Sequence, residues 1–129
     1  MTMKQKGELA LRTRAMPGDT NPAGDIFGGW LMGQMDIVGG IVARQRARGR
    51  VVTVAVDGFM FHKPVHVGDV VCCYTDLLDI GRTFIKFLTQ ARILHKRQTG
   101  RRVKVTEGIF TFVAIDEDHQ KRPVPPDVN

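Results

Sequence analysis

Residues 25–43 read DIFGGWLMGQMDIVGGIVA, and the rest of the chain is organised around this stretch. At about 100° per residue it predicts one long apolar helix with two unlike faces. One face carries the carboxylate of Asp36 in a lane with few bulky side chains, formed by Gly29, Met32, Gly33, Gly39, Gly40 and Ala43. Glycine inside a helix costs roughly 0.5–1 kcal/mol relative to alanine. The lane therefore predicts that another element or a ligand comes close to the helix backbone beside Asp36.

Three other interpretations of this stretch stay open. Its length is near that of a membrane-spanning helix, but a carboxylate at the centre of such a span costs on the order of 3 kcal/mol. Asp36 is alternatively a paired structural group of a core helix. Any such partner must come from elsewhere in the fold, because no Lys, Arg or His lies within four residues of Asp36. Finally, the glycines alternatively serve only close helix packing, which is compatible with a functional role.

Composition indicates one ordinary globular domain over residues 1–129, since 129 residues suffice for a single core. Hydrophobic residues make up 43% of the chain and charged residues 25%, as is usual for such domains. The first eight residues contain no apolar run, so we expect no signal peptide. Cys72 and Cys73 are adjacent and would point to opposite faces of a strand, which suits neither a disulfide framework nor a zinc site. A reducing, cytoplasmic setting is therefore expected.

The net charge of +6 and a pI near 9.8 favour an anionic partner. Nucleic acid, a membrane surface and a phosphorylated small molecule all qualify, and charge alone does not choose among them. Four arginines lie between residues 44 and 50, where they favour the negative end of the helix dipole and predict a solvated helix end.

The remaining pattern predicts strands on both sides of the helix. We expect a loop before the helix at residues 17–24, a helix stop at Gly49 and a bulge or turn at residues 57–58. The tail from residue 117 is polar and proline-rich, which predicts a loose segment. One apolar helix between strands must bury itself against a single antiparallel sheet, so the order of elements predicts an α+β fold. The expected strands cover residues 8–16, 51–61, 67–75, 83–94 and 102–115, with a hairpin turn at 98–101.

The stretch PGDTNPAGDIFGGWLMGQMD at residues 17–36 closely resembles the YciA-type acyl-CoA thioester hydrolases of the hot-dog fold. The likeness continues through GRVVTVAV at 49–56 and KPVHVGDVVCCY at 63–74, and more weakly through TEGIFTFVAID at 106–116. The resemblance implies a curved antiparallel sheet wrapped around one long central helix. It also implies a homodimer with active sites at the shared interface, commonly as a trimer of dimers in a hexamer.

By this resemblance, the chain hydrolyses acyl-CoA thioesters to free coenzyme A and a carboxylic acid. Asp36 is then the catalytic carboxylate, as general base or as direct nucleophile, and Asp25 helps to place water or substrate in a site shared with the partner. Free N–H groups at the first turn of a helix can hold a developing oxyanion, and Gly28 and Gly29 would leave that turn unshielded. The oxyanion and substrate-binding candidates are Gly28, Gly29, Trp30 and Asn21.

Coenzyme A enters this reaction as part of substrate and product, so we expect no separate cofactor and no metal. The four histidines show no spacing typical of metal ligands. The candidates for binding the phosphates of coenzyme A are Arg82, Lys86, Arg101, Arg102 and Lys104. Two alternatives remain: a hot-dog dehydratase or hydratase, which is disfavoured because no histidine lies on the helix, and a non-catalytic basic binding module. We expect no nucleic acid or membrane partner.

Overall fold

The structure, a computed structural model, describes residues 8–26, 28–94 and 102–127. It contains one long helix, one short 3-10 helix and five strands over these ranges. The elements are β1 (Glu8–Arg14), η1 (Pro17–Asp19), α1 (Gly28–Ala47), β2 (Val51–Phe61), β3 (Val70–Ile80), β4 (Phe84–Leu94) and β5 (Val103–Ala114). The predicted hairpin turn at 98–101 lies outside the described residues.

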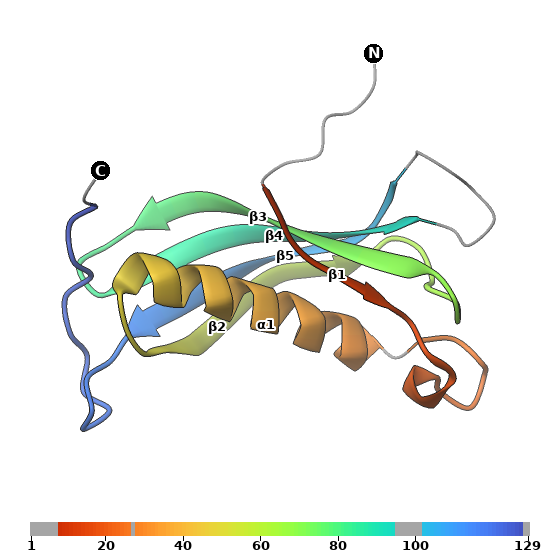
Figure 1. The fold of residues 1–129 in the computed structure, drawn as a ribbon, viewed down its shortest axis with the longest axis horizontal. Coiled ribbons are helices and arrows are strands. Elements are labelled where there is room, and N and C mark those ends of the chain that lie inside the picture. Colours follow the sequence, from red (N-terminus) through yellow and green to blue (C-terminus); the bar gives the residue numbers. More distant parts are fainter. Residues whose placement is uncertain (1–7, 27, 95–101, 128–129) are drawn as a thin grey trace, which may run out of the picture.

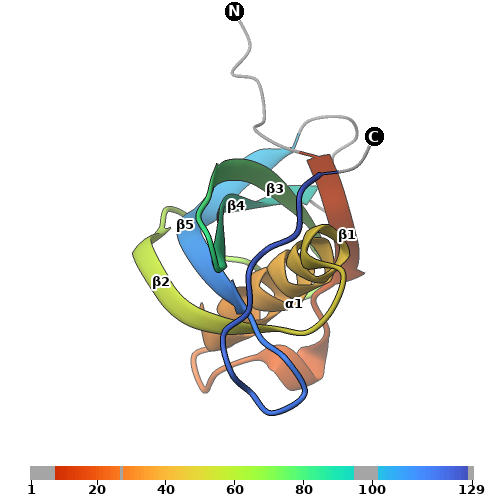
Figure 2. The same ribbon diagram turned by 90° about the vertical axis from the view of Figure 1, so that its left-hand side faces the viewer.

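The five strands form one sheet in the order β1-β3-β4-β5-β2, and every neighbouring pair is antiparallel. Figure 1 shows α1 lying along the sheet, and Figure 2 shows the sheet curving around the helix. Because α1 follows β1 and precedes β2, it connects the two edge strands of the sheet. The predicted α+β, hot-dog layout is confirmed.

The core lies between α1 and the concave face of the sheet. Leu31, Met35 and Val38 recur at helical spacing and are buried. They belong to the same core cluster as Phe110 and Phe112 of β5. Full burial of a side chain of this size contributes roughly 1.5–3 kcal/mol, so this face of α1 fixes the helix on the sheet.

Two boundaries of the predicted elements are informative. The strand predicted at residues 67–75 begins instead at Val70, because Gly68 adopts a φ of 92° and the N–H of Asp69 bonds to the carbonyl of His66 in a turn. The bulge predicted at residues 57–58 is confirmed, since the register between β2 and β5 shifts there and Gly58 has a φ of 58°.

Residues 117–127, which belong to the tail predicted as loose, make specific hydrogen bonds. The N–H of Arg122 donates to the carbonyl of Ala114, and the N–H of Val124 donates to the carbonyl of Arg82. The guanidinium of Arg46, near the end of α1, donates to the carbonyl of Pro125 at 2.6 Å. The tail thus links the end of the helix to the sheet, as the dark blue segment in Figure 2 shows.

In the part of the chain that the structure describes, no helix has the length and apolarity needed to cross a membrane.

Candidate active site

Asp36 lies in the third turn of α1, where its carboxylate faces the first half of β2. The hydroxyl of Thr53 donates a hydrogen bond to Asp36 Oδ1 at 2.6 Å. Thr53 lies opposite Phe112 in the register of β2 and β5, so its side chain shares the helix-facing side of the sheet. Among the described residues no ion pair involves Asp36, and the side chain is only partly buried. These features do not match a core carboxylate neutralised by a cation.

The glycine lane of α1 divides into two parts with different surroundings. A Cβ atom added to Gly39 would lie 2.7 Å from the ring of Phe112, so this glycine allows the helix to pack closely on its own sheet. Gly29 and Gly33 have no atom within 4 Å of such a Cβ. The described chain therefore accounts for Gly39 but leaves the space over Gly29 and Gly33 open.

Among the described residues α1 begins at Gly28, so the Gly28–Gly29 pair lies in its first turn, as the sequence predicts. The first amides of α1 have no acceptor within the helix and carry the positive end of its dipole. Gly29 is exposed, whereas a Cβ on Gly28 would lie 2.7 Å from the ring of Phe61. Trp30 packs partly buried against the core, which is a structural position for its ring. The exposed amide turn is consequently flanked by an aromatic ring on one side.

Asn21 and Asp25 belong to the loop before the helix. Asn21 Oδ1 accepts hydrogen bonds from the N–H groups of Ala23 and Asp25, at 3.0 and 3.1 Å. Asn21 therefore orders the loop and fixes the backbone of Asp25. The Asp25 carboxylate is about half exposed and lies 3.5 Å from His66 Nδ1. Sequence reasoning gave His66 no role, because it lies far from Asp25 along the chain.

The predicted phosphate-binding residues do not form one cluster in a single chain. Lys86 lies opposite Thr111, and Lys104 lies opposite Arg92, roughly 20 Å further along β4. Lys104 also forms an ion pair with Glu107 at 3.1 Å. Arg82 is exposed, and Lys86 lies over the ring of Phe84. Arg102 Nε is buried and has no hydrogen-bond partner among the described residues. Arg101 lies outside the described residues.

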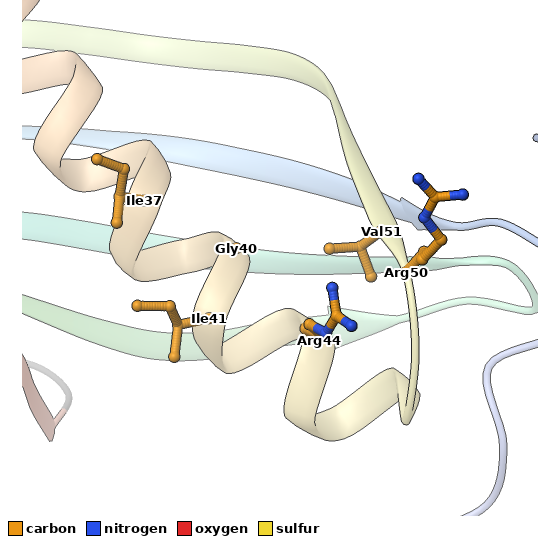
Figure 3. A pocket seen from close by; sticks show the side chains of 6 residues that line it. All are labelled: Ile37, Gly40, Ile41, Arg44, Arg50 and Val51. Atoms are coloured by element: carbon orange, nitrogen blue, oxygen red, sulfur yellow. The ribbon is translucent and has the colours of Figure 1, made fainter.

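A cavity of about 300 Å³, open to the surface, lies between α1 and the start of β2 (Figure 3). Asp36 and Thr53 do not line it, but they are close along the chain to residues that do. Ile37 follows Asp36 directly, and Val51 precedes Thr53 by two residues, which places both on the same side of β2. The lining residues are Ile37, Gly40, Ile41, Arg44, Arg50 and Val51. The sequence interpretation of residues 44–50 as a solvated helix end missed this cavity, which forms only because β2 turns back along the helix.

No group of three or more His, Cys, Asp or Glu side chains within residues 8–26, 28–94 and 102–127 is arranged to hold a metal ion. Cys72 and Cys73 are free and buried.

A helix wrapped by a curved antiparallel sheet is the hot-dog fold, and a carboxylate and an open amide turn on that helix are groups that a hydrolase of this fold can use. A family model of the Thioesterase superfamily matches residues 23–99, and the chain belongs to this superfamily. It is 52% identical over 122 residues to the acyl-CoA thioester hydrolase YciA of Salmonella typhimurium, covering 93% of this chain and 92% of that protein.

Two solved structures extend the comparison. The hexameric thioesterase y2039 from Yersinia pestis superposes with a TM-score of 0.90 at 51% identity, over 96% of this chain and 100% of that one. An acyl-CoA hydrolase from Staphylococcus aureus, solved with butyryl coenzyme A and coenzyme A, superposes with a TM-score of 0.82 at 29% identity. That match covers 89% of this chain and 70% of the other.

The Staphylococcus aureus hydrolase was also solved as three variants, in which an aspartate, an asparagine or a threonine is replaced by alanine. Those three residues have the same spacing along their chain as Asp36, Asn21 and Thr53 have along this one. Sequence reasoning missed Thr53, because it stands in a run of β-branched residues that reads as a buried strand. The signal available was that Thr53 is the one polar side chain among residues 51–56.

Proposed function

We propose that this chain hydrolyses acyl-CoA thioesters to free coenzyme A and a carboxylic acid, with Asp36 as its catalytic carboxylate. The observation that carries the proposal is the Asp36–Thr53 hydrogen bond, together with the open amide turn at the start of the same helix. The membership of the superfamily and the equal spacing of the residues replaced in the Staphylococcus aureus hydrolase support it.

The geometry assigns complementary roles to the two partners. The Thr53 hydroxyl donates to Asp36 Oδ1 and fixes the plane of the carboxylate, which leaves Oδ2 for water or for the thioester carbon. As a general base, Asp36 takes a proton from water while the oxygen attacks the carbonyl carbon. As a nucleophile, it forms a mixed anhydride that water then cleaves. Both routes break the carbon–sulfur bond and protonate the departing thiolate. In the general-base route this happens after water has added to the carbonyl carbon, and in the nucleophilic route it happens as the anhydride forms, before water cleaves it.

The second requirement is a place for the negative charge that develops on the carbonyl oxygen. We assign this role to the amides of Gly28 and Gly29, since a preformed pair of donors in a shielded site is typically worth a few kcal/mol. Gly28 lies roughly 12 Å from Asp36 along the axis of α1. This separation is too large for one thioester to contact both within a single helix, so the amides and the carboxylate of one site come from two chains.

Such a shared site requires self-association, and the surface beside Asp36 has the right character. β2 is an edge strand, bonded only to β5 among the described strands, and edge strands offer unpaired backbone groups to a second chain. The exposed apolar residues of α1 and β2 are Ile37, Ile41, Val52, Val54, Met60 and Phe61. We infer a homodimer formed through this surface, with three dimers in a hexamer, as the hexameric relative supports.

In that dimer, Asp25 of one chain acts with Asp36 of the other. Asp25 leaves a loop whose backbone is fixed by Asn21, so its carboxylate is held outside the helix and half exposed. We further assign the phosphates of coenzyme A to basic residues outside the sheet. Arg82 and Lys86 suit this role better than Lys104, which is already paired with Glu107. We infer that the reaction uses no cofactor, since a carboxylate, water and backbone amides supply every step, and that the enzyme is cytoplasmic.

The test is release of free thiol from a panel of acyl-CoA thioesters by the purified protein. A thioesterase releases one thiol and one acid per turnover. A dehydratase or hydratase would change the acyl chain and release no thiol, and a binding module would do neither. Absence of thiol release across the whole panel would refute the proposal.

A further inference from the structure

The cavity between α1 and the start of β2 combines an apolar wall with a cationic end. Ile37 and Ile41 stand on successive turns of α1, and Figure 3 shows them toward one end, with Arg44 and Arg50 toward the other. Gly40 lies between them and leaves the helix backbone bare. Methylene groups suit the first part of this cavity, and an anion suits the second.

Both arginines are anchored through the backbone while their side chains stay available. The carbonyl of Arg44 accepts from the N–H of Gly49 at 3.2 Å, and the carbonyl of Arg50 accepts from Ile115 at 3.0 Å. None of the ion pairs among the described residues includes either guanidinium. Arg44 and Arg50 both line the cavity, and Figure 3 shows the Arg44 guanidinium beside the helix and the Arg50 guanidinium beyond Val51. Each is a separate candidate for an oxyanion, since arginine binds carboxylates and phosphates in a two-pronged geometry.

The separation between Asp36 and Arg44 distinguishes a carboxylate from a phosphate as the bound anion. Arg44 lies two turns beyond Asp36, roughly 12 Å along the helix, and its side chain leans back toward the start of the helix. The pantetheine arm of coenzyme A, with its two amide units, is longer than the remaining distance between the Asp36 carboxylate and the Arg44 guanidinium. A carboxylate at the far end of a short acyl chain fits this separation better than a phosphate of coenzyme A does.

We propose that this cavity binds the acyl group, and that Arg44 and Arg50 select acyl groups ending in a carboxylate. The preferred substrates are then monothioesters of short dicarboxylic acids. This inference rests on the proposed function and adds a substrate class to it.

The experiment compares glutaryl-CoA with pentanoyl-CoA, which have equally long acyl chains and differ in the terminal carboxylate. We expect the Arg44→Gln, Arg50→Gln double variant to lose roughly tenfold in kcat/KM for glutaryl-CoA, the scale of a lost charge-assisted pair, and less than twofold for pentanoyl-CoA. Arg48→Asn is the matched control: it removes an exposed guanidinium of the same segment at a φ of 55°, a conformation that asparagine tolerates. The control should preserve the preference.

Acyl-pantetheines provide the second arm, because they lack all phosphates. Relative to wild type, the double variant should again lose more kcat/KM for glutaryl-pantetheine than for pentanoyl-pantetheine. If both CoA substrates fall equally and neither pantetheine does, the arginines bind phosphate and the inference is overturned. Equal losses on all four substrates also overturn it.

Circular dichroism and the measured oligomer size accompany each variant. If the double variant fails to fold, Arg44→Gln alone carries the comparison, since its side chain is exposed on the helix. Failure of the wild type to release thiol from either glutaryl-CoA or pentanoyl-CoA counts against the proposed function itself. Turnover of pentanoyl-CoA without an arginine-dependent preference for glutaryl-CoA rejects only this inference.

Discussion

Thr53 Oγ1 lies 2.6 Å from Asp36 Oδ1 and joins the edge strand of the sheet to the third turn of the helix. Hydrogen bonds to charged groups contribute roughly 1.5–3 kcal/mol. This contact is therefore strong enough to hold a reactive carboxylate in one orientation. We expect Thr53→Val, which keeps the branched shape and removes the hydroxyl, to lower kcat on the order of ten- to a hundredfold. Thr53→Ser retains the donor and should stay close to wild type, and a Val variant of unchanged kcat would contradict this role.

Asp36→Asn should abolish most of the hydrolysis while the protein stays folded. The change is nearly isosteric and still accepts the Thr53 hydrogen bond, but it removes the basic oxygen. A positioned base typically contributes about 10²–10⁴-fold. Turnover of a short acyl-CoA is measured alongside circular dichroism. Activity within about threefold of wild type, well short of that range, would end the case for Asp36.

Asp25 and Asp36 are expected to act together across two chains. Asp25→Asn and Asp36→Asn are prepared separately, each is shown to be impaired, and the two are mixed under conditions of subunit exchange. About half of the dimers are then mixed, each with one intact site, so about a quarter of all sites recover. If both residues served the same chain's site, every site would keep one lesion. Proven exchange without a gain in activity therefore contradicts the shared site.

Gly29 lies in open space, so its lack of a side chain has no explanation within its own chain. We expect Gly29→Ala to leave the free energy of unfolding unchanged or to raise it by up to about 1 kcal/mol. The variant should lower kcat/KM, because the methyl group shields the amide turn. Gly18→Ala, also in open space but in the loop, is the matched control and should leave kcat/KM intact. Equal activity of the two variants would show that no substrate approaches Gly29.

Recognition of the phosphates of coenzyme A should depend on salt. The chain carries a net charge of +6, and exposed charges are screened within about 8 Å at physiological ionic strength. Acyl-pantetheine, which has no phosphate, should therefore show a much lower kcat/KM than the same acyl-CoA, with a gap that narrows as salt rises. Equal kcat/KM values for the two substrates at low salt would rule out this contribution.

The sequence predicted those parts of the site that lie on one element. Asp36 and the glycine lane are separated by helical spacing, so one period places them together on α1. The family resemblance then supplied the hot-dog name and the chemistry, which periodicity alone does not contain. The order of elements and most strand boundaries followed from the same patterns.

The parts that were missed depend on how separate elements meet. Thr53 reaches Asp36 only because the register of β2 and β5 turns its side chain toward the helix. Arg44 and Arg50 form one cavity only because the chain reverses at Gly49. The glycine lane predicted a close neighbour without naming it, and only the packed sheet shows that Phe112 lies beneath Gly39. No single-element pattern encodes these distances.

The burial of Cys72 and Cys73 has a consequence for the reaction. Each turnover liberates a mobile thiol, coenzyme A, next to a protein that carries two thiols of its own. Both cysteines are fully buried, and burial, with a smaller contribution from Cys72, raises the pKa of Cys73 to about 12. Since only an accessible thiolate attacks thioesters or disulfides, these side chains neither capture acyl groups nor form mixed disulfides with the product. A thiol-reactive dye added to the native protein should then report released coenzyme A alone. Repeated turnover should not acylate the two cysteines or convert them to mixed disulfides.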